Sequence, residues 1–265
     1  MFSFLQLSRP IDGIHSDTIF YILGYKINNS TLFSVLILAL LAVVCFFVIK
    51  RFRQSPGRLQ ILFEIIYGLV ENLILQITGS KKETRIILPF IGAIFVFVLA
   101  SNLLGIIPGI TSITYDGKML LRIPTADFST TLALALASFV IIQILSVKDF
   151  GIFGYIGKYI KVKELYLGFR QGFKQGMLAM VEFFVGFLDI IGEVAKVASV
   201  SLRLFGNMYA GMVLATVMSG VLAYALPTFL VAMGLLVAVV QTIVFTALIT
   251  VYYTMAVKID TAEDL

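Results

Sequence analysis

Charged side chains recur at a fixed interval inside an otherwise apolar stretch of this sequence. Four of them lie seven residues apart, at Glu182, Asp189, Lys196 and Arg203. Seven residues complete almost two turns of an α-helix, so each of these side chains lies only about 20° around the helix from the previous one. Together they form one stripe along one face of a helix. Three further polar residues lie about one turn from stripe members, at Glu193, Ser199 and Asn207. Such a stripe can hold or pass an ion along a helix.

Arg203 is the most informative member of the stripe, because it precedes 54 residues without a charge, Leu204 to Val257. A guanidinium deep in a membrane costs at least about 2.5–3.5 kcal/mol, so it persists where it faces water, an anion or a partner. An arginine side chain is not deprotonated in proteins and cannot relay a proton. The nearest acid on its face, Asp189, lies two turns beyond Lys196, so we expect its counter-ion on another chain.

A simpler interpretation is that these charges pair with one another and hold a helical bundle together. Glu193 and Lys196 have the spacing of such a pair. Glu182 is equally compatible with solvation at the membrane surface. For Arg203 the energetic cost makes this interpretation weak.

The helix that follows supplies one polar group at a similar depth, Gln241. If the turn is centred near Leu222, antiparallel pairing places Gln241 opposite Arg203 and Val237 opposite Asn207. Gln241 would then orient the guanidinium, or serve only to join two helices. Small residues also recur along the Arg203 helix and permit close approach of other helices: Gly186, Gly192, Ala195, Ala198, Gly206, Ala210 and Gly211.

The composition indicates which kind of element must position these residues. Of 265 residues, 60% are hydrophobic and only 13% are charged, against about 45–50% and about 25% in soluble domains. The chain is therefore predicted to be a membrane protein. Its single histidine, His15, and single cysteine, Cys45, exclude a His-based metal site or proton relay and a disulfide framework. No feature predicts a nucleic-acid partner or a cofactor.

Charge-free runs of 20 residues or more predict spanning helices. The stretch 57–79 is interrupted by polar residues and is predicted to be an amphipathic helix on the membrane surface. The 54-residue run would measure about 81 Å as one helix and must fold back. The expected segments are an external N-terminal segment of residues 1–26, spans 27–49, 86–107, 128–147, 176–219 and 228–257, the surface helix 57–79 and a basic cytoplasmic loop 148–175.

We therefore predict an all-α integral membrane protein with one domain, 1–265. It has five spanning helices plus an amphipathic membrane-surface helix, and the last two spans form a long tilted helical hairpin. Because lysine and arginine collect beside the inner ends of the spans, the N-terminus is expected outside and the C-terminus in the cytoplasm. We read no signal peptide in residues 1–26.

The run Ser201-Leu202-Arg203-Leu204-Phe205-Gly206-Asn207-Met208-Tyr209-Ala210-Gly211 resembles the signature of subunit a of the rotary F-type ATP synthase. Further similarity lies in Ser101-Asn102-Leu103-Leu104-Gly105-Ile106-Ile107-Pro108-Gly109, in Pro124-Thr125-Ala126-Asp127 and in Gln241. The resemblance implies a static subunit beside a rotating ring of c subunits. Its expected partners are the c-ring, the b subunits of the peripheral stalk and the rest of the F1Fo complex.

The resemblance also implies roles for individual residues. Arg203 would face the ring carboxylates, with Asn207 and Gln241 lining the ion path near it, while Asp189 and Lys196 match positions near the cytoplasmic half-channel. Two positions that are usually acidic or histidine in the family hold Met212 and Gly234 here. Asp127 is the nearest external acid that could serve instead, although capping a helix after Pro124 is an equal alternative.

The expected function is therefore coupling of H⁺ or Na⁺ translocation to ring rotation through two half-channels, in a bacterial cytoplasmic (inner) membrane. The chain itself is expected to catalyse no reaction. The alternatives are a self-contained channel or secondary transporter that binds an anion at Arg203, and a purely structural membrane anchor. Internal inverted repeats would favour a transporter, and we find none.

Overall fold

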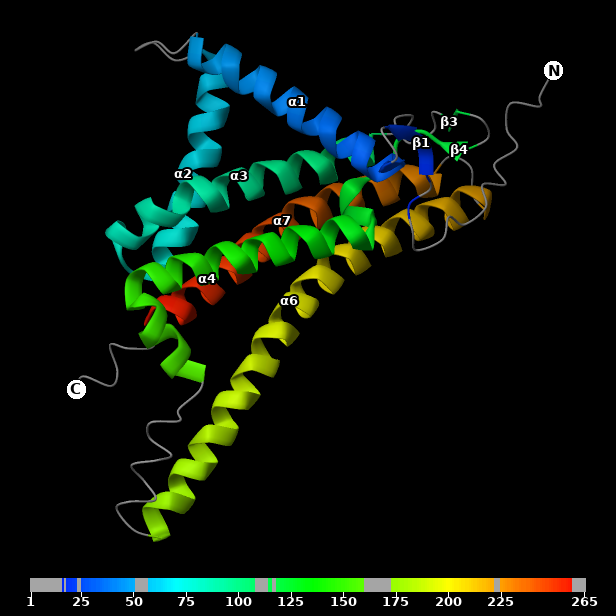
Figure 1. The fold of residues 1–265 in the computed structure, drawn as a ribbon. Coiled ribbons are helices and arrows are strands. Elements are labelled where there is room, and N and C mark those ends of the chain that lie inside the picture. The colour runs from blue at the N-terminus through cyan, green and yellow to red at the C-terminus, as the bar shows by residue number, and fades with distance from the viewer. Residues whose placement is uncertain are drawn as a thin grey trace, which may run out of the picture. The chain divides into compact units, whose positions relative to one another are not determined.

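The computed structural model describes residues 16, 18–22, 25–50, 57–107, 114–115, 118–159, 173–221 and 225–258. Its helices are α1 (Asn29–Lys50), α2 (Arg58–Thr78), α3 (Lys81–Ile106), α4 (Phe128–Tyr159), α6 (Phe173–Val221) and α7 (Ala225–Lys258), shown in Figure 1. The short elements are β1 (Thr18–Ile22), β2 (Tyr25–Asn28), β3 (Thr114–Tyr115), β4 (Lys118–Met119) and the 3₁₀ turn η3 (Pro124–Ala126). The all-helical membrane architecture predicted from the sequence is confirmed.

Five helices of the described residues are long and apolar enough to cross a membrane: Asn29–Lys50, Gln60–Thr78, Lys81–Ile106, Phe128–Lys148 and Phe229–Val257. The number agrees with the prediction, but the set contains α2 and not α6. The described residues of α6 include Asp189, Glu193, Lys196 and Arg203, whereas Gln60–Thr78 carries only Glu64 and Glu71. The predicted surface position of 57–79 is not confirmed.

The chain divides into two compact units. Unit 1 consists of Met1–Ala133 and Ser201–Val251, and unit 2 consists of Leu134–Val200 and Tyr252–Leu265. Each unit therefore combines segments that lie far apart in the sequence. Arg203, Asn207, Gln241 and Asp127 belong to unit 1.

Unit 1 contains two short antiparallel β-hairpins, one before α1 and one after α3. β1 pairs with β2 and β3 pairs with β4, and Figure 1 shows these strands at the end of unit 1 where α1 begins. The β1–β2 hairpin was not predicted, because it lies in a segment without a clear alternating pattern. Asp116 and Gly117, between β3 and β4, lie outside the described residues.

The turn between α2 and α3 is closed by local hydrogen bonds. Gly79 ends α2 with φ 69°, and its N–H donates to the Leu75 carbonyl. This left-handed backbone conformation favours glycine. The hydroxyls of Thr78 and Thr84 lie 3.0 Å apart, and Thr84 Oγ1 also donates to the Ser80 carbonyl.

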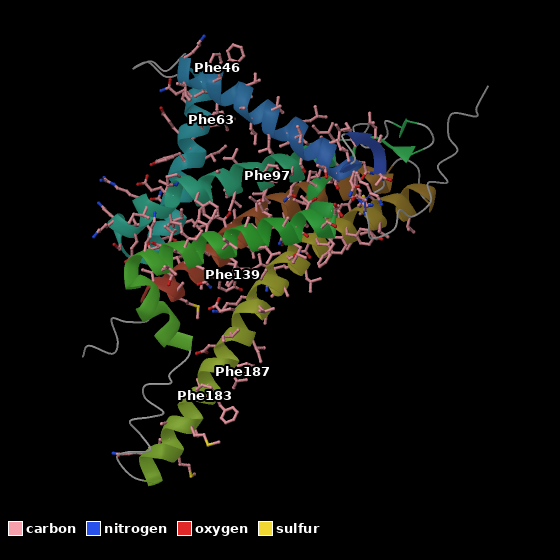
Figure 2. The ribbon with its side chains drawn as sticks, in the orientation of Figure 1. Phe46, Phe63, Phe97, Phe139, Phe183 and Phe187 are labelled. Carbon is pink, nitrogen blue, oxygen red and sulfur yellow. The ribbon has the colours of Figure 1, made fainter. Side chains whose placement is uncertain are left out.

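The outer surface of these helices is apolar. Phe46 on α1 is 54% exposed and Ile49 is 74% exposed, and Figure 2 shows Phe46, Phe63 and Phe97 on α1, α2 and α3. The core of unit 1 includes Ile87, Ile91 and Val98 of α3, all almost completely buried. Large apolar side chains on the outside are typical of a lipid-facing surface.

The helical hairpin predicted for the end of the chain is present. Only residues 222–224 separate α6 from α7, and Gly220 and Pro227 lie on either side of this gap. Pro227 is the third residue of α7, a position where its missing N–H removes no helical hydrogen bond.

Candidate functional site

One face of α6 in unit 1 is open and the opposite face is buried. The open face follows helical spacing through Arg203, Asn207, Ala210 and Leu214, all of them exposed or half-buried. The buried face contains Ser201, Leu204 and Met208. The small side chain of Ala210 leaves room for close approach of another helix beside Asn207.

Contacts with the start of α4 fix the orientation of this helix. Ser201 Oγ donates to Thr131 Oγ1 at 3.4 Å, and the Phe205 ring lies edge-on against Phe128 with centroids 5.7 Å apart. Phe205 also stacks on Tyr209, with centroids 5.2 Å apart. Because Ser201 and Phe205 are anchored inward, Arg203 between them points to the open face.

Arg203 makes no hydrogen bond or ion pair with any residue that the structure describes. It is exposed, and Leu202 beside it is 54% exposed. A guanidinium on an apolar, membrane-type surface requires an anion or water. That its counter-ion lies on another chain stays a prediction.

Asn207 and Gln241 form the polar contact between α6 and α7. Asn207 Nδ2 donates to Gln241 Oε1 at 2.6 Å. The predicted register is wrong by one helical turn, because Gln241 was expected opposite Arg203 and bonds Asn207 instead. The hairpin turn falls slightly later than Leu222, which moves the pairing. Gln241 is 5% exposed, and its Nε2 has no partner among the described residues.

A second set of buried hydrogen bonds continues from α7 to α3 and η3. Asn102 Nδ2 donates to Thr242 Oγ1 at 3.3 Å, and Thr125 Oγ1 donates to Asn102 Oδ1 at 2.7 Å. Thr242 in turn donates to the Ala238 carbonyl. Asn102 and Thr125 lie within the motifs that carry the family resemblance, whereas Thr242 was missed, since one threonine in an apolar helix carries no separate signal.

Asp127 lies at the start of α4 and is 1% exposed. Its Oδ2 accepts hydrogen bonds from Ser30 Oγ at 2.6 Å and from Thr130 Oγ1 at 3.2 Å, while Oδ1 has no partner among the described residues. The carboxylate therefore joins the beginnings of α1 and α4. The contact with Ser30 was missed, because 97 residues separate the two positions.

Arg122 is a second buried charge near this contact, 2% exposed, with Nη2 3.4 Å from the Ala126 carbonyl. Its burial was not predicted, since it precedes η3 in a connection that the sequence marks only as polar.

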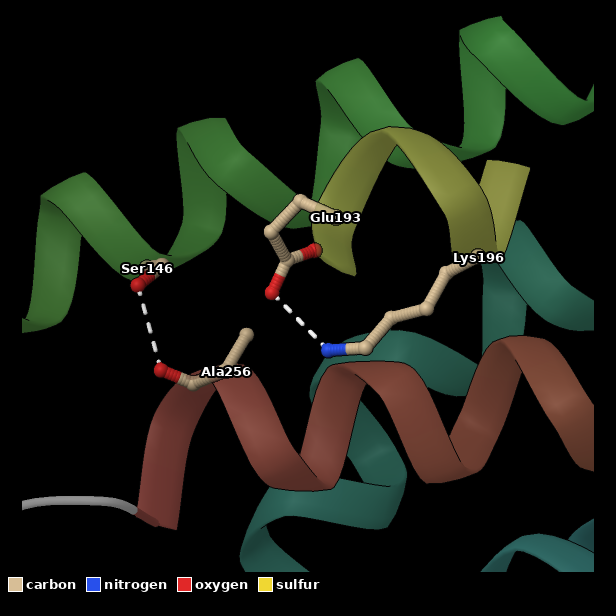
Figure 3. A network of polar contacts seen from close by, with 4 residues as sticks. All are labelled: Ser146, Glu193, Lys196 and Ala256. Carbon is tan, nitrogen blue, oxygen red and sulfur yellow. Dashed lines mark hydrogen bonds and ion pairs between the residues drawn. The ribbon is translucent and has the colours of Figure 1, made fainter. Parts of the chain in front are cut away.

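In unit 2, Glu193 and Lys196 form the ion pair that their spacing predicts. Lys196 Nζ lies 2.9 Å from Glu193 Oε1, and the Lys196 ammonium lies 5.6 Å from the centre of the Tyr252 ring. Figure 3 shows this pair beside the hydrogen bond from Ser146 Oγ to the Ala256 carbonyl. The pairing interpretation is confirmed for these two residues.

The other predicted site residues of unit 2 whose side chains the structure describes are exposed to solvent or lipid. Asp189 and Ser199 are exposed, and neither makes a hydrogen bond or ion pair with the described residues of the chain. The Glu182 side chain lies outside the described residues. No group of three or more His, Cys, Asp or Glu side chains that could hold a metal ion occurs within the described ranges.

The two positions that depart from the family pattern lie in unit 1. Met212 is half-buried on α6. A Cβ built on Gly234 would meet Ile106 of α3 at 3.8 Å, which is an ordinary contact. The space at Gly234 is therefore limited by an apolar side chain.

The fold and this site together define a class: a helical membrane protein whose penultimate helix carries exposed polar residues and an arginine that finds no counter-ion among the described residues. Residues 31–254 match the family model described as ATP synthase A chain. The chain belongs to the ATP synthase subunit a family, so the resemblance seen in the sequence is confirmed.

Relatives with that name cover most of the chain. ATP synthase subunit a of Geotalea daltonii is 33% identical over 217 residues, 82% of this chain and 82% of the relative. ATP synthase subunit a 2 of Acaryochloris marina is 29% identical over 246 residues, 92% of each chain. ATP synthase subunit a of Nitrosospira multiformis is 29% identical over 249 residues, 93% of this chain and 86% of the relative.

Proposed function

We propose that this chain is the static ion-conducting subunit of an F-type ATP synthase membrane sector. In this proposal two half-channels reach a rotating c-ring from opposite sides of the membrane, and Arg203 stands between them. The observation that supports this proposal most directly is that Arg203 is exposed on an apolar helix and has no counter-ion among the described residues. Ring carboxylates would supply the missing anion.

Arg203 would force ions to travel with the ring. At about 4 Å and an effective dielectric constant of about 20, a guanidinium attracts a carboxylate by about 4 kcal/mol. A ring carboxylate passing Arg203 is therefore favoured in its ionised form and must release its H⁺ or Na⁺ first. Because the guanidinium keeps its own proton, it passes no ion between the half-channels.

The polar groups on either side of Arg203 would line the two paths. Asn207 and Gln241 would lie on the outer path, while Asp189, Glu193, Lys196 and Ser199 would lie on the cytoplasmic one. Asp127 is the one acid proposed for the external side, and its alternative role is to anchor the start of α4. Its two hydroxyl donors and low exposure favour the anchoring role.

Rotation would link ion flow to chemistry on other chains. One elementary charge crossing 100 mV releases about 2.3 kcal/mol, so several ions per turn supply the energy for ATP synthesis, or ATP hydrolysis drives ions backwards. This chain would perform no bond chemistry. The b subunits of the peripheral stalk would hold it, in a bacterial cytoplasmic membrane with the N-terminus outside and the C-terminus inside.

The test is Arg203→Ala in the whole complex reconstituted into lipid vesicles. We expect assembly to persist, since an exposed side chain leaves no core void, while ATP synthesis driven by an imposed ion gradient is abolished. Arg203→Lys should also fail, because an ammonium cannot reproduce the planar guanidinium.

Arg85→Ala is the matched control, since Arg85 is also exposed but lies near the start of α3. It should synthesise ATP at nearly the unmodified rate. Near-normal synthesis by Arg203→Ala, or ion conduction by the chain alone without a ring, would contradict the proposal and favour a self-contained channel.

A further inference from the structure

The middle of α4 carries an open groove that the proposed ion path does not use. Its volume is about 390 Å³. Its walls lie in unit 2 and are Phe139, Val140, Gln143, Ile144, Val147 and Lys148. Figure 2 shows Phe139 on this helix.

The groove follows from helix geometry. Two rows of side chains with a spacing of four residues run along α4, one through Phe139, Gln143 and Val147 and the other through Val140, Ile144 and Lys148. Rows of this kind form ridges on a helix surface, with a furrow between them. Val140 is 50% exposed and Ile144 is 52% exposed, so the second ridge is open.

The length and ends of the furrow fit one leaflet of a bilayer. From Phe139 to Lys148 the helix rises about 13.5 Å, close to half of a hydrocarbon core of about 30 Å. The charge-free run Phe128–Val147 is followed directly by Lys148. The apolar furrow thus lies at acyl-chain depth and the Lys148 ammonium at the level of the headgroups.

The charge at the polar end is available. Lys148 is exposed and makes no ion pair within the ranges that the structure describes. The sequence that follows adds Lys158, Lys161, Lys163, Arg170 and Lys174 against Asp149 and Glu164. A basic segment at the end of a spanning helix attracts anionic lipid.

We infer that this groove binds an anionic phospholipid, with one acyl chain along the furrow and its phosphate beside the Lys148 ammonium. Assignment of the lipid to the cytoplasmic leaflet rests on the orientation in the proposed function. Binding itself does not depend on ion translocation. A phospholipid held there would fill the furrow and cover the exposed ridge, so that bulk lipid would not contact this face of α4 directly.

The experiment uses the whole complex, purified in detergent and stripped of lipid. Phosphatidylglycerol and phosphatidylcholine, each with a photoreactive group on one acyl chain, are added separately, and labelled peptides are identified by mass spectrometry. We expect phosphatidylglycerol to label the peptide containing Val140 and Ile144 more strongly than phosphatidylcholine does. Lys148→Ala should reduce phosphatidylglycerol labelling there about fivefold and reduce phosphatidylcholine labelling less, because the phosphatidylcholine headgroup carries no net charge.

Two further variants distinguish the contribution of the apolar furrow to lipid binding from that of the Lys148 charge. Ile144→Trp fills the furrow and should reduce labelling by both lipids while Lys148 remains. Lys50→Ala is the matched control, because Lys50 also ends a spanning helix but lies 4.4 Å from the Phe46 ring. It should leave α4 labelling unchanged.

Equal labelling by the two lipids, or unchanged labelling in Lys148→Ala, would overturn the inference. Absence of α4 labelling by either lipid would also overturn it and would mean that a protein helix covers the furrow. Lys148→Ala should still pump ions in vesicles, whereas Arg203→Ala should lose pumping and keep α4 labelling. Failure of the lipid site is therefore distinguishable from failure of the proposed function.

Discussion

Asn207 of α6 and Gln241 of α7 are joined by a 2.6 Å hydrogen bond, in which the buried glutamine accepts and its own amide group finds no partner among the described residues. Asn207 is exposed and Gln241 is not. One bond thus links the open face of α6 to the interior of unit 1. The Gln241 Nε2 group is enclosed inside unit 1, where a buried water molecule would satisfy it.

This bond predicts energetic coupling between the two residues. Gln241→Leu and Asn207→Leu should each lower ion-driven ATP synthesis in vesicles, because each removes a polar group from the proposed path. In a double-mutant cycle on thermal stability of the complex, the coupling should be about 0.5–1.5 kcal/mol. Purely additive effects would show that the bond does not persist in the assembled complex.

Asp127 provides a test between anchoring and ion transfer. Asp127→Asn retains an oxygen that accepts from Ser30 and Thr130, so we expect near-normal ATP synthesis and a small loss of stability. Asp127→Leu leaves buried hydroxyls unpaired and should cost about 1–3 kcal/mol, measured by thermal unfolding of the complex. Ser30→Ala should weaken the same contact without removing the carboxyl group. Loss of ion flow in a normally assembled Asp127→Asn complex would instead assign Asp127 to the outer path.

Gly105 is required by a close approach between α3 and the chain before η3. A Cβ at this position would lie 2.6 Å from Ile123 Cδ1 and 2.7 Å from Cγ1. Gly105→Ala should therefore destabilise the complex by about 1–3 kcal/mol, and Ile123→Ala should relieve the overlap in the double variant.

Gly92→Ala is the matched control in the same helix, because nothing lies within 4 Å of its Cβ position. It should stabilise α3 by about 0.5–1 kcal/mol, since alanine is the better helix former. Equal loss of stability at both glycines, in the same thermal unfolding assay, would mean that Ile123 is not the cause.

Met212 and Gly234 test whether the outer path is hydrated without its usual titratable groups. In a Cys45→Ser background, cysteines placed at these positions in the assembled complex should react with water-soluble thiol reagents added from outside. An ion cannot cross a dry apolar region, so the path needs water even where no acid is present. Cys45 itself is exposed on α1 and is removed to avoid background reaction. Unreactive thiols at both positions would place the outer path elsewhere.

The helical architecture could be predicted because spanning helices require long apolar runs, which are visible in one sequence. The Glu193–Lys196 pair also followed from local spacing. The Ser30–Asp127 and Asn102–Thr242 contacts could not, since they join segments 97 and 140 residues apart. The predicted partner of Gln241 was wrong by one helical turn. The position of the connection between α6 and α7 sets which residues of the two helices face each other, and the sequence defines that position only to within a few residues. Polar interruptions in 57–79 suggested a surface helix, although length and composition also permit a span.

The closed turn between α2 and α3 has a mechanical consequence. In the proposed function a ring turning past α6 exerts a sideways force on this chain at every step, and a static subunit must transmit that torque without yielding. The Thr78–Thr84 and Thr84–Ser80 hydrogen bonds and the Gly79 cap tie the end of α2 to the start of α3. Under such a force the two helices would move together, whereas a chain without these bonds would let each helix bend alone.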